Sequence, residues 1–345
     1  MITLLVALGV ALAPERPGRP TQPARFAMSV DSSRRQLVLT LGPYDLATEP
    51  DMPMMDMQEM EDHSPRFVWP ANTWLRAYHV RVTDAQGHPL PSSLLHHFAL
   101  VDFDRRDLVY PIVDRVFGGG EETGDVSLPV GIAVPVRGGD HIGFYFMWHN
   151  ETGTDLTGVT LRIAFTWTPR NEQPAPQLVV PFWVDVNYHA GDDNTYPAPP
   201  GGVVKTCVFS FPVSGHLLAA GAHLHPWGAS VRLEDSATGR VIANVGVDHA
   251  PDGKLPNVSR RLFGIWGMGP HLEAGRRYRV VAVYDNPTDS TLTGLMGILG
   301  GLFAPDHPEQ WPALDRNDST YLRDLSGFLM ADQNRPTPIT IAGVR

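Results

Sequence analysis

The chain has 345 residues, which is long for one domain and comfortable for two. Hydrophobic residues make up 43% and charged residues 19%, a globular composition with ample material for a core. The formal net charge of −10, with no basic stripe to neutralise phosphates, argues against nucleic acid as a partner.

The composition bears on the fold class and on whether disulfides can stabilise it. The 33 glycines and 32 prolines, with short runs rich in Val, Thr, Trp and Tyr, favour an all-β fold with frequent turns. Cys207 is the only cysteine, so no intramolecular disulfide can form. It lies in the alternating run VVKTCVFSF, which predicts an inert, buried thiol.

The N-terminus reads as an export signal. Residues 3–13 (TLLVALGVALA) are apolar but too short to span a bilayer, and they end in the small-residue pattern Ala11-Leu12-Ala13. No Lys or Arg precedes this run, and Pro14 is an unusual residue after a cleavage site. We interpret residues 1–27 as a signal and leader segment. The mature protein is then periplasmic or extracellular, without a transmembrane span.

Residues 28–169 are predicted to form a first β-sandwich domain. None of its segments keeps a 3.6-residue period over ten residues, whereas short alternating runs recur. The expected strands are Gln36–Leu41, Trp74–Thr83, Leu94–Leu100, His141–Trp148 and Gly158–Thr168.

A methionine-rich segment, DMPMMDMQEMEDH, interrupts this domain at residues 51–63. The simpler interpretation of this segment is a mobile acidic loop. Its alternative is an accessory Cu(I) site, because thioethers are soft ligands. The ligands of that site would be Met52, Met54, Met55, Met57, Met60 and His63.

A polar, proline-containing linker at residues 170–177 leads to a second β-sandwich domain, residues 178–345. Turn signals about every ten residues predict strands there, and residues 304–345 are expected to be packed coil. The fold class is therefore all-β, with two consecutive antiparallel, jelly-roll-like sandwiches and an interdomain cleft. The expected strands are Leu178–Val186, Val203–Phe211, Ser230–Glu234, Val241–Val247, Tyr278–Tyr284 and Leu292–Phe303.

Histidine motifs carry the chemistry. In GAHLHPWG, His223 and His225 share one face of a β-strand, as two ligands of one metal must. The adjacent His96 and His97 can serve one metal only if a bulge or strand end turns one of them. His149 stands at a strand end. Taken singly, each motif is also explained by structural histidines, and the adjacent pair is a weaker geometric signal than HxH.

The ordered set HH, H, HxH and M resembles the copper type II, ascorbate-dependent monooxygenases, the family of peptidylglycine α-hydroxylating monooxygenase and dopamine β-monooxygenase. The segments HHFALVDF, FYFMWHNETGTDLTGVTLRIAF and GAHLHPWGASVRLED carry this resemblance, which covers about residues 70–305. The separations between consecutive motifs are 52, 74 and 71 residues; the first is somewhat short for the family.

The resemblance implies two copper ions per chain, held at two sites that face each other across an open interdomain cleft. His96, His97 and His149 would form an electron-transferring site in the first domain. His223, His225 and Met296 would form the catalytic site in the second, because the soft thioether of Met296 favours Cu(I), the state that binds O2. The partners would be O2, an external reductant such as ascorbate and a small-molecule or apolar substrate.

Two departures from the family pattern bear on the substrate. Peptide-hydroxylating members place an arginine where Gly221 stands, and a tyrosine and an asparagine follow their methionine ligand, where this chain continues GILG. The anchors for a glycine-extended peptide are therefore absent. A non-catalytic copper-binding or delivery protein and a metal-free β-sandwich binding module remain alternatives. A mononuclear cupin is excluded by spacing. Its metal site needs a glutamate four or five residues after the HxH motif, whereas Glu234 lies nine residues after His225.

Overall fold

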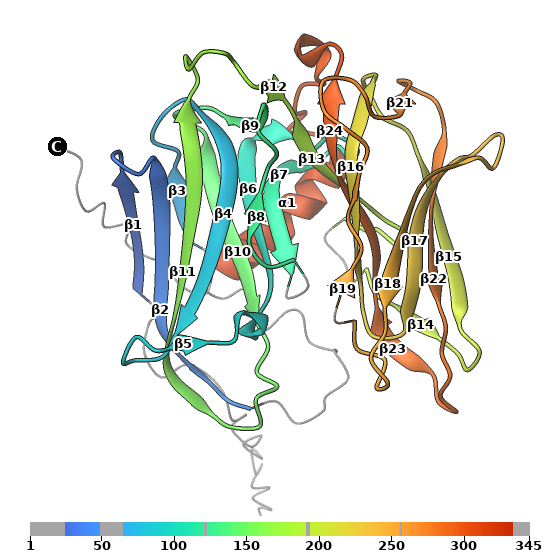
Figure 1. The fold of residues 1–345 in the computed structure, drawn as a ribbon, viewed down its shortest axis with the longest axis horizontal. Helices are drawn as coiled ribbons and strands as arrows, with labels where there is room; N and C mark the ends of the chain where they lie inside the picture. Colours follow the sequence, from blue (N-terminus) through green and yellow to red (C-terminus); the bar gives the residue numbers. More distant parts are fainter. Residues whose placement is uncertain (1–24, 49–64, 121–122, 191–193, 256, 334–345) are drawn as a thin grey trace, which may run out of the picture.

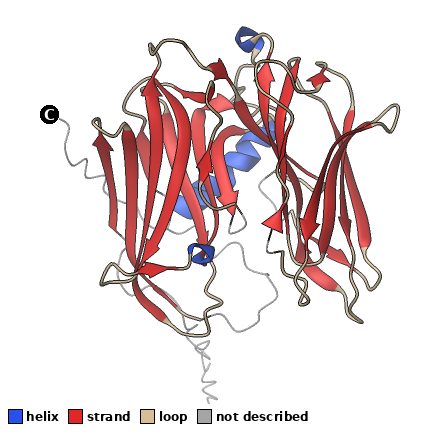
Figure 2. Ribbon diagram, in the orientation of Figure 1, coloured by secondary structure: helices blue, strands red, loops and turns tan. Residues whose placement is uncertain are grey.

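The structure, a computed structural model, describes residues 25–48, 65–120, 123–190, 194–255 and 257–333. Two β-sandwiches lie side by side in it (Figure 1). Strands dominate, and the longest helix lies behind them near the middle of the view (Figure 2). The prediction of two consecutive antiparallel β-sandwich domains is confirmed. Within the described ranges, no helix is long and apolar enough to cross a membrane.

The first sandwich has an eight-stranded and a four-stranded sheet. Alternating side chains of both sheets, among them Leu39, Phe144 and Phe165, fill the core between them. The larger sheet runs in the order β1 (Arg25–Asp31), β2 (Gln36–Leu46), β11 (Leu156–Pro169), β4 (Thr73–Thr83), β9 (Ile132–Val136) and β12 (Gln177–Leu178), with β5 (Pro89–Leu90) and β8 (Val126–Ser127) beside β4. The smaller runs β3 (Arg66–Val68), β10 (His141–Trp148), β6 (Leu95–Arg106) and β7 (Val113–Gly120).

The second sandwich is built from three smaller sheets around a separate core. One sheet contains β13 (Val180–Asp185), β24 (Gly297–Pro305), β16 (Gly215–Leu224), β20 (Arg261–Leu262) and β21 (His271–Leu272), and it faces the first sandwich in Figure 1. Another contains β15 (Val203–Phe209), β22 (Tyr278–Tyr284), β17 (Gly228–Asp235), β18 (Val241–Asp248) and β19 (Asn257–Val258). The third pairs β14 (Tyr196–Ala198) with β23 (Leu292–Leu295).

The two sandwiches share core residues. Leu218 and Ala304, from the second, pack in the core of the first, and Leu108, from the first, packs in the core of the second. The chain passes from one to the other between Leu178 and Val180. The last residue of the expected linker, Gln177, is already a strand residue, because β12 pairs in parallel with β9.

The C-terminal region differs from the coil expected for residues 304–345. After a 3-10 turn (Pro308–Gln310), helix α1 (Ser319–Gln333) begins. Asp318 caps the helix, because its Oδ1 accepts the backbone N–H groups of Thr320 (2.7 Å) and Tyr321 (3.2 Å). Tyr321 then packs in a small apolar cluster on the outer face of β6, β7 and β10.

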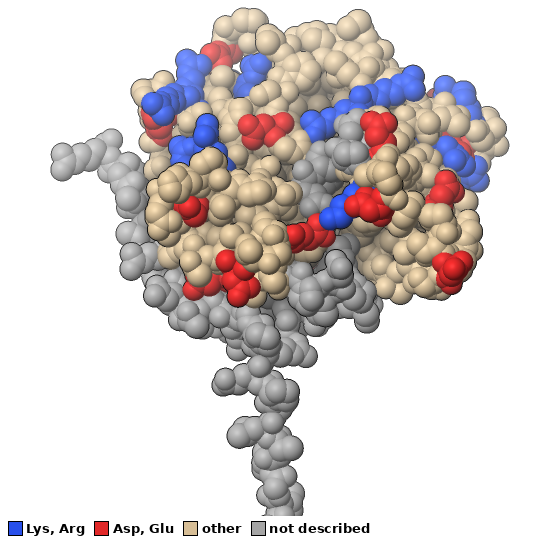
Figure 3. Space-filling view, turned by 60° about the horizontal axis from the view of Figure 1, so that its bottom comes forward, with Lys and Arg blue, Asp and Glu red and all other residues tan. Residues whose placement is uncertain are grey.

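Two further expectations are corrected. Leu292–Phe303 is not one strand: it is interrupted at Met296, and β23 and β24 pair with different partners. Cys207 is half-buried rather than buried, because β15 lies at the edge of its sheet, and its burial raises the pKa of the thiol. The described surface in Figure 3 intersperses acidic and basic side chains among uncharged ones.

Candidate metal centre

His96 and His97 lie at a β-bulge. On β10, Met147 pairs with His97 and the next residue, Trp148, pairs with Leu95, so His96 is the extra residue on β6. A bulge turns consecutive side chains away from strict alternation. The two imidazole rings consequently lie with their centroids 4.0 Å apart. The condition that the sequence set for this pair, a bulge, is met.

His149 joins this pair from the end of β10. Its backbone N–H donates to the Leu94 carbonyl at 2.9 Å, which fixes the residue beside the start of β6. Its ring lies edge-on to that of His96, with centroids 5.2 Å apart. The three histidines expected to act together in the first sandwich are therefore neighbours.

His223 lies on β16, and His225 lies in the turn that follows it. The Nε2 atoms of these two residues are 3.1 Å apart, so the HxH pair converges although β16 ends at Leu224. The turn is closed by a hydrogen bond from the Gly228 N–H to the His225 carbonyl.

Backbone contacts fix the protonation of His225. Its Nδ1 lies 2.6 Å from the Gly294 carbonyl, which can only accept, so Nδ1 carries the hydrogen. Burial, together with the positive charge that His223 would carry if protonated, lowers the pKa of His225 well below its usual value, while the Gly294 carbonyl opposes that shift. The ring is therefore neutral and presents an Nε2 lone pair. A ligating histidine is commonly held in this way.

The two histidine sets meet. The Nε2 atoms of His97 and His223 are 3.0 Å apart, and the centroids of their rings are 4.5 Å apart. The resemblance implied two sites facing each other across an open cleft, whereas these sets are in direct contact. The physical reason is the packing of the sandwiches, in which Leu218, on the same strand as His223, is buried in the first core. We call His96, His97, His149, His223 and His225 the five-histidine cluster.

The cluster has the electrostatics of a cation site. His223 Nε2 is close to both His97 and His225, and one ring hydrogen cannot satisfy two such contacts fully. Burial and the neighbouring histidines lower the pKa of His97 well below its usual value, so a proton is disfavoured as the bridging cation. A tetrahedral metal with nitrogens about 2.0–2.1 Å away separates them by roughly 3.3 Å, near the observed distances. His96, His97 and His225 also place one ring nitrogen each within 4.8 Å of one another.

Met296 lies at the break between β23 and β24, and it is buried. Its carbonyl accepts a hydrogen bond from the Tyr284 hydroxyl at 2.5 Å, and the same hydroxyl accepts the His225 backbone N–H at 2.7 Å. Met296 and His225 are thus tied to one tyrosine. The expected accessory ligands at residues 52–63 lie outside the described residues.

Sequence reasoning missed Tyr284 and Gly294. Tyr284 closes an apolar strand, and a tyrosine there signals a buried hydroxyl that needs a partner. Gly294 acts through its backbone carbonyl, for which the sequence holds no signal.

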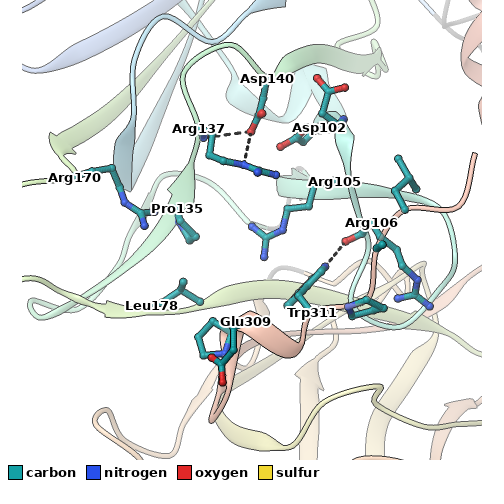
Figure 4. A pocket seen from close by; sticks show the side chains of 15 residues that line it. Asp102, Arg105, Arg106, Pro135, Arg137, Asp140, Arg170, Leu178, Glu309 and Trp311 are labelled. Atoms are coloured by element: carbon teal, nitrogen blue, oxygen red, sulfur yellow. Dashed lines mark hydrogen bonds and ion pairs between the residues drawn. The ribbon is translucent and has the colours of Figure 1, made fainter.

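A separate cavity of about 380 Å³ is lined by the C-terminal part of β6, which begins five residues after His97 (Figure 4). It is lined by mixed charges, including Arg105, Arg170 and Asp140, with Trp311 donating its indole N–H to the Arg106 carbonyl. None of the five histidines lines it. Its charges oppose one another, so it does not define a ligand.

Comparisons with known proteins do not identify the function of this site. No protein-family model matches the sequence, and no curated protein matches it. Among solved structures, PNGF-II aligns with 77% of this chain at 11% identity and a TM-score of 0.35; this chain covers 66% of PNGF-II, just under two thirds. STIV MCP aligns with 73% of the chain (95% of its own length) at 11% identity and a TM-score of 0.36. PBCV-1 VP54 aligns with 85% (95% of its own) at 7% identity and 0.29. Similarities this distant carry no argument about function.

Proposed function

We propose that this protein is a copper-dependent monooxygenase that hydroxylates a C–H bond of a small or apolar substrate with O2 and an external reductant such as ascorbate. The ligands would be His96, His97 and His149 in one set and His223, His225 and Met296 in the other. Bound copper would supply O2 activation and the electrons for it.

The observation that carries the proposal is the convergence of imidazole nitrogens from both sandwiches. His97, His223 and His225 bring their Nε2 atoms to 3.0–3.1 Å in consecutive pairs. Neutral imidazoles suit copper and zinc better than Mg²⁺ or Ca²⁺, which prefer oxygen ligands. The protein's own contribution is to keep His97 and His225 neutral by burial and to orient His225 through Gly294 and Tyr284.

The surroundings of Gly221 support a substrate position beside His223. Residues two apart on a strand share a face, so Gly221 and His223 point the same way from β16. A Cβ atom added at Gly221 would meet no other atom within 4 Å among the described residues. Glycine stands at this position in place of the carboxylate-binding arginine of the peptide-hydroxylating enzymes, which favours an uncharged substrate.

A copper-binding protein without turnover is the second candidate. The contact between His97 and His223 favours it, because nitrogens 3.0 Å apart leave no room for a substrate between the two sets. In this arrangement the five histidines would serve as one binding site.

Copper analysis after anaerobic Cu(I) loading, followed by O2 uptake with ascorbate, tests both candidates. A monooxygenase should bind two coppers and consume O2 with a substrate; His225→Ala should abolish the uptake while copper remains on His96, His97 and His149. A binding protein should hold copper, lose it with His225→Ala and show no turnover. The control is His79→Ala, which removes an exposed histidine of β4 whose ring contacts Asp125. Equal copper content in wild type and His225→Ala, with no O2 uptake by either, would refute both candidates.

Deletion of residues 52–60 completes this test. Two coppers retained after the deletion would support the paired ligand sets. Loss of most of the copper with the segment would identify the methionines as the main ligands and favour a metal carrier.

A further inference from the structure

A second group of metal-binding side chains lies at the other end of β16. His216 is the second residue of this strand and His223 is the ninth. At about 3.3 Å per residue, seven residues separate the two by roughly 23 Å. A site at His216 is therefore independent of the five-histidine cluster.

Three strands bring this group together. His216 on β16 pairs directly with His271 on β21, and directly opposed side chains share one face of a sheet. Their ring centroids are 5.0 Å apart. Asp306 follows the last residue of β24, and its backbone N–H donates to the Ser214 carbonyl at 3.0 Å. The carboxylate is thereby placed beside both rings.

The ligand atoms face one another. Asp306 Oδ1 lies 3.7 Å from His216 Nε2, and Asp306 Oδ2 lies 2.8 Å from His271 Nε2. One atom from each of the three residues falls within a group no more than 4.8 Å across. Small shifts of exposed side chains would bring all three to about 2.0–2.2 Å from a common ion.

The backbone holds His216 as a metal ligand is usually held. Its Nδ1 lies 2.9 Å from the Gly269 carbonyl, so Nδ1 carries a hydrogen and donates it. In the neutral ring, Nε2 then directs a lone pair at the Asp306 carboxylate, which also offers lone pairs. Two acceptors that face each other repel unless a cation lies between them, either a proton on His216 or a metal ion that also contacts His271. A carbonyl that fixes the outer nitrogen of a histidine is the usual support of a metal site.

We propose that His216, His271 and Asp306 form a second metal site, which binds a divalent first-row transition ion such as Zn²⁺. Two imidazoles and one carboxylate are a Zn²⁺ ligand set that leaves at least one coordination position open. The three side chains are between 26% and 44% exposed, so an ion can enter without separation of the sandwiches. The open position would be taken by water or by a small anionic ligand. This proposal does not rest on copper chemistry at the five-histidine cluster.

Zn²⁺ binding to the full chain, measured by equilibrium dialysis with metal analysis, tests the site. Wild type is compared with His271→Ala and with Asp306→Asn, which keeps the side-chain shape but removes the charge. Loss of a contact that only supports a ligand costs about 10–100-fold in metal affinity, so loss of a direct ligand should cost at least about 100-fold. Each variant should therefore bind one equivalent fewer than wild type. The control, His88→Ala, removes an exposed histidine that lies beside Asp84 in a turn away from this site, and it should bind as wild type does.

Copper loading of the same variants separates this site from the five-histidine cluster. His271→Ala and Asp306→Asn should load Cu(I) as wild type does, whatever the outcome of the copper proposal. Unchanged Zn²⁺ stoichiometry in both variants would overturn the second site and leave an imidazolium–carboxylate pair in its place. Co²⁺ absorption of wild type is the independent readout: a tetrahedral spectrum lost in either variant supports the site, and its absence in wild type refutes it.

Discussion

Replacing Tyr284 by phenylalanine tests the link between the second core and the histidines. The hydroxyl is buried; it accepts the His225 backbone N–H at 2.7 Å and donates to the Met296 carbonyl at 2.5 Å. The variant keeps the ring and its packing, and it leaves two buried backbone groups without this partner.

The magnitude follows from those two groups. A buried polar group left without its partner costs about 1–3 kcal/mol, so loss of two such contacts in Tyr284→Phe should lower the free energy of unfolding by about 2–6 kcal/mol. That is a large part of the roughly 5–15 kcal/mol typical of a folded protein. Since the lost contacts position His225, copper affinity should also fall, by about 10–100-fold if the cluster binds copper.

Tyr196→Phe is the matched control. Its ring lies edge-on to that of Tyr284, with centroids 5.9 Å apart, and its buried hydroxyl has no hydrogen-bond partner within the described ranges. Its removal should leave the free energy of unfolding unchanged or raise it. Urea denaturation of both variants and wild type measures the difference. Equal destabilisation by the two substitutions would refute the reasoning.

Three further predictions concern other parts of the molecule. Burial raises the pKa of Asp107 to about 7, so its stabilising contribution is present below the ordinary pKa near 3.9 and is lost as pH rises through 7. Asp107→Asn should therefore stabilise the protein more at pH 8 than at pH 5 in urea denaturation; equal effects would contradict this. Asp324→Asn removes the buried carboxylate that pairs with partly buried Arg115 at 2.7 and 3.0 Å, and it should cost about 3–5 kcal/mol and open α1 to proteolysis. Gly221→Leu should block turnover by filling the space beside His223 while copper content stays at the wild-type value; full activity would remove the substrate from that position.

Local pattern predicted the strands well. The bounds of His141–Trp148 and Tyr278–Tyr284 agree with the structure, because period-two alternation and flanking turn residues are properties of the segment itself. Helix α1 was missed, although Asp318 ahead of Ser319 is an N-cap signal. Its proline- and aspartate-rich surroundings hid that signal.

The geometry of the candidate site could be predicted only in part from the sequence, because it depends on residues distant in the chain. The bulge at His96 arises from the pairing of β6 with β10, in which Trp148 lies opposite Leu95. These strands are some fifty residues apart along the chain, so the pairing register cannot be predicted from the local sequence of either strand. The contact of His97 with His223 depends on how two sandwiches pack, which HxH and HH motifs do not encode. The interruption at Met296 likewise reflects two different partner strands.

The exchange of core residues between the sandwiches limits how this protein can be divided. A chain cut between Leu178 and Val180 would leave the first half without Leu218 and Ala304, and the second without Leu108. Each fragment would then have unfilled positions in its apolar core, where side chains of the other fragment pack in the intact chain. We therefore expect each half to be less stable on its own than in the intact chain.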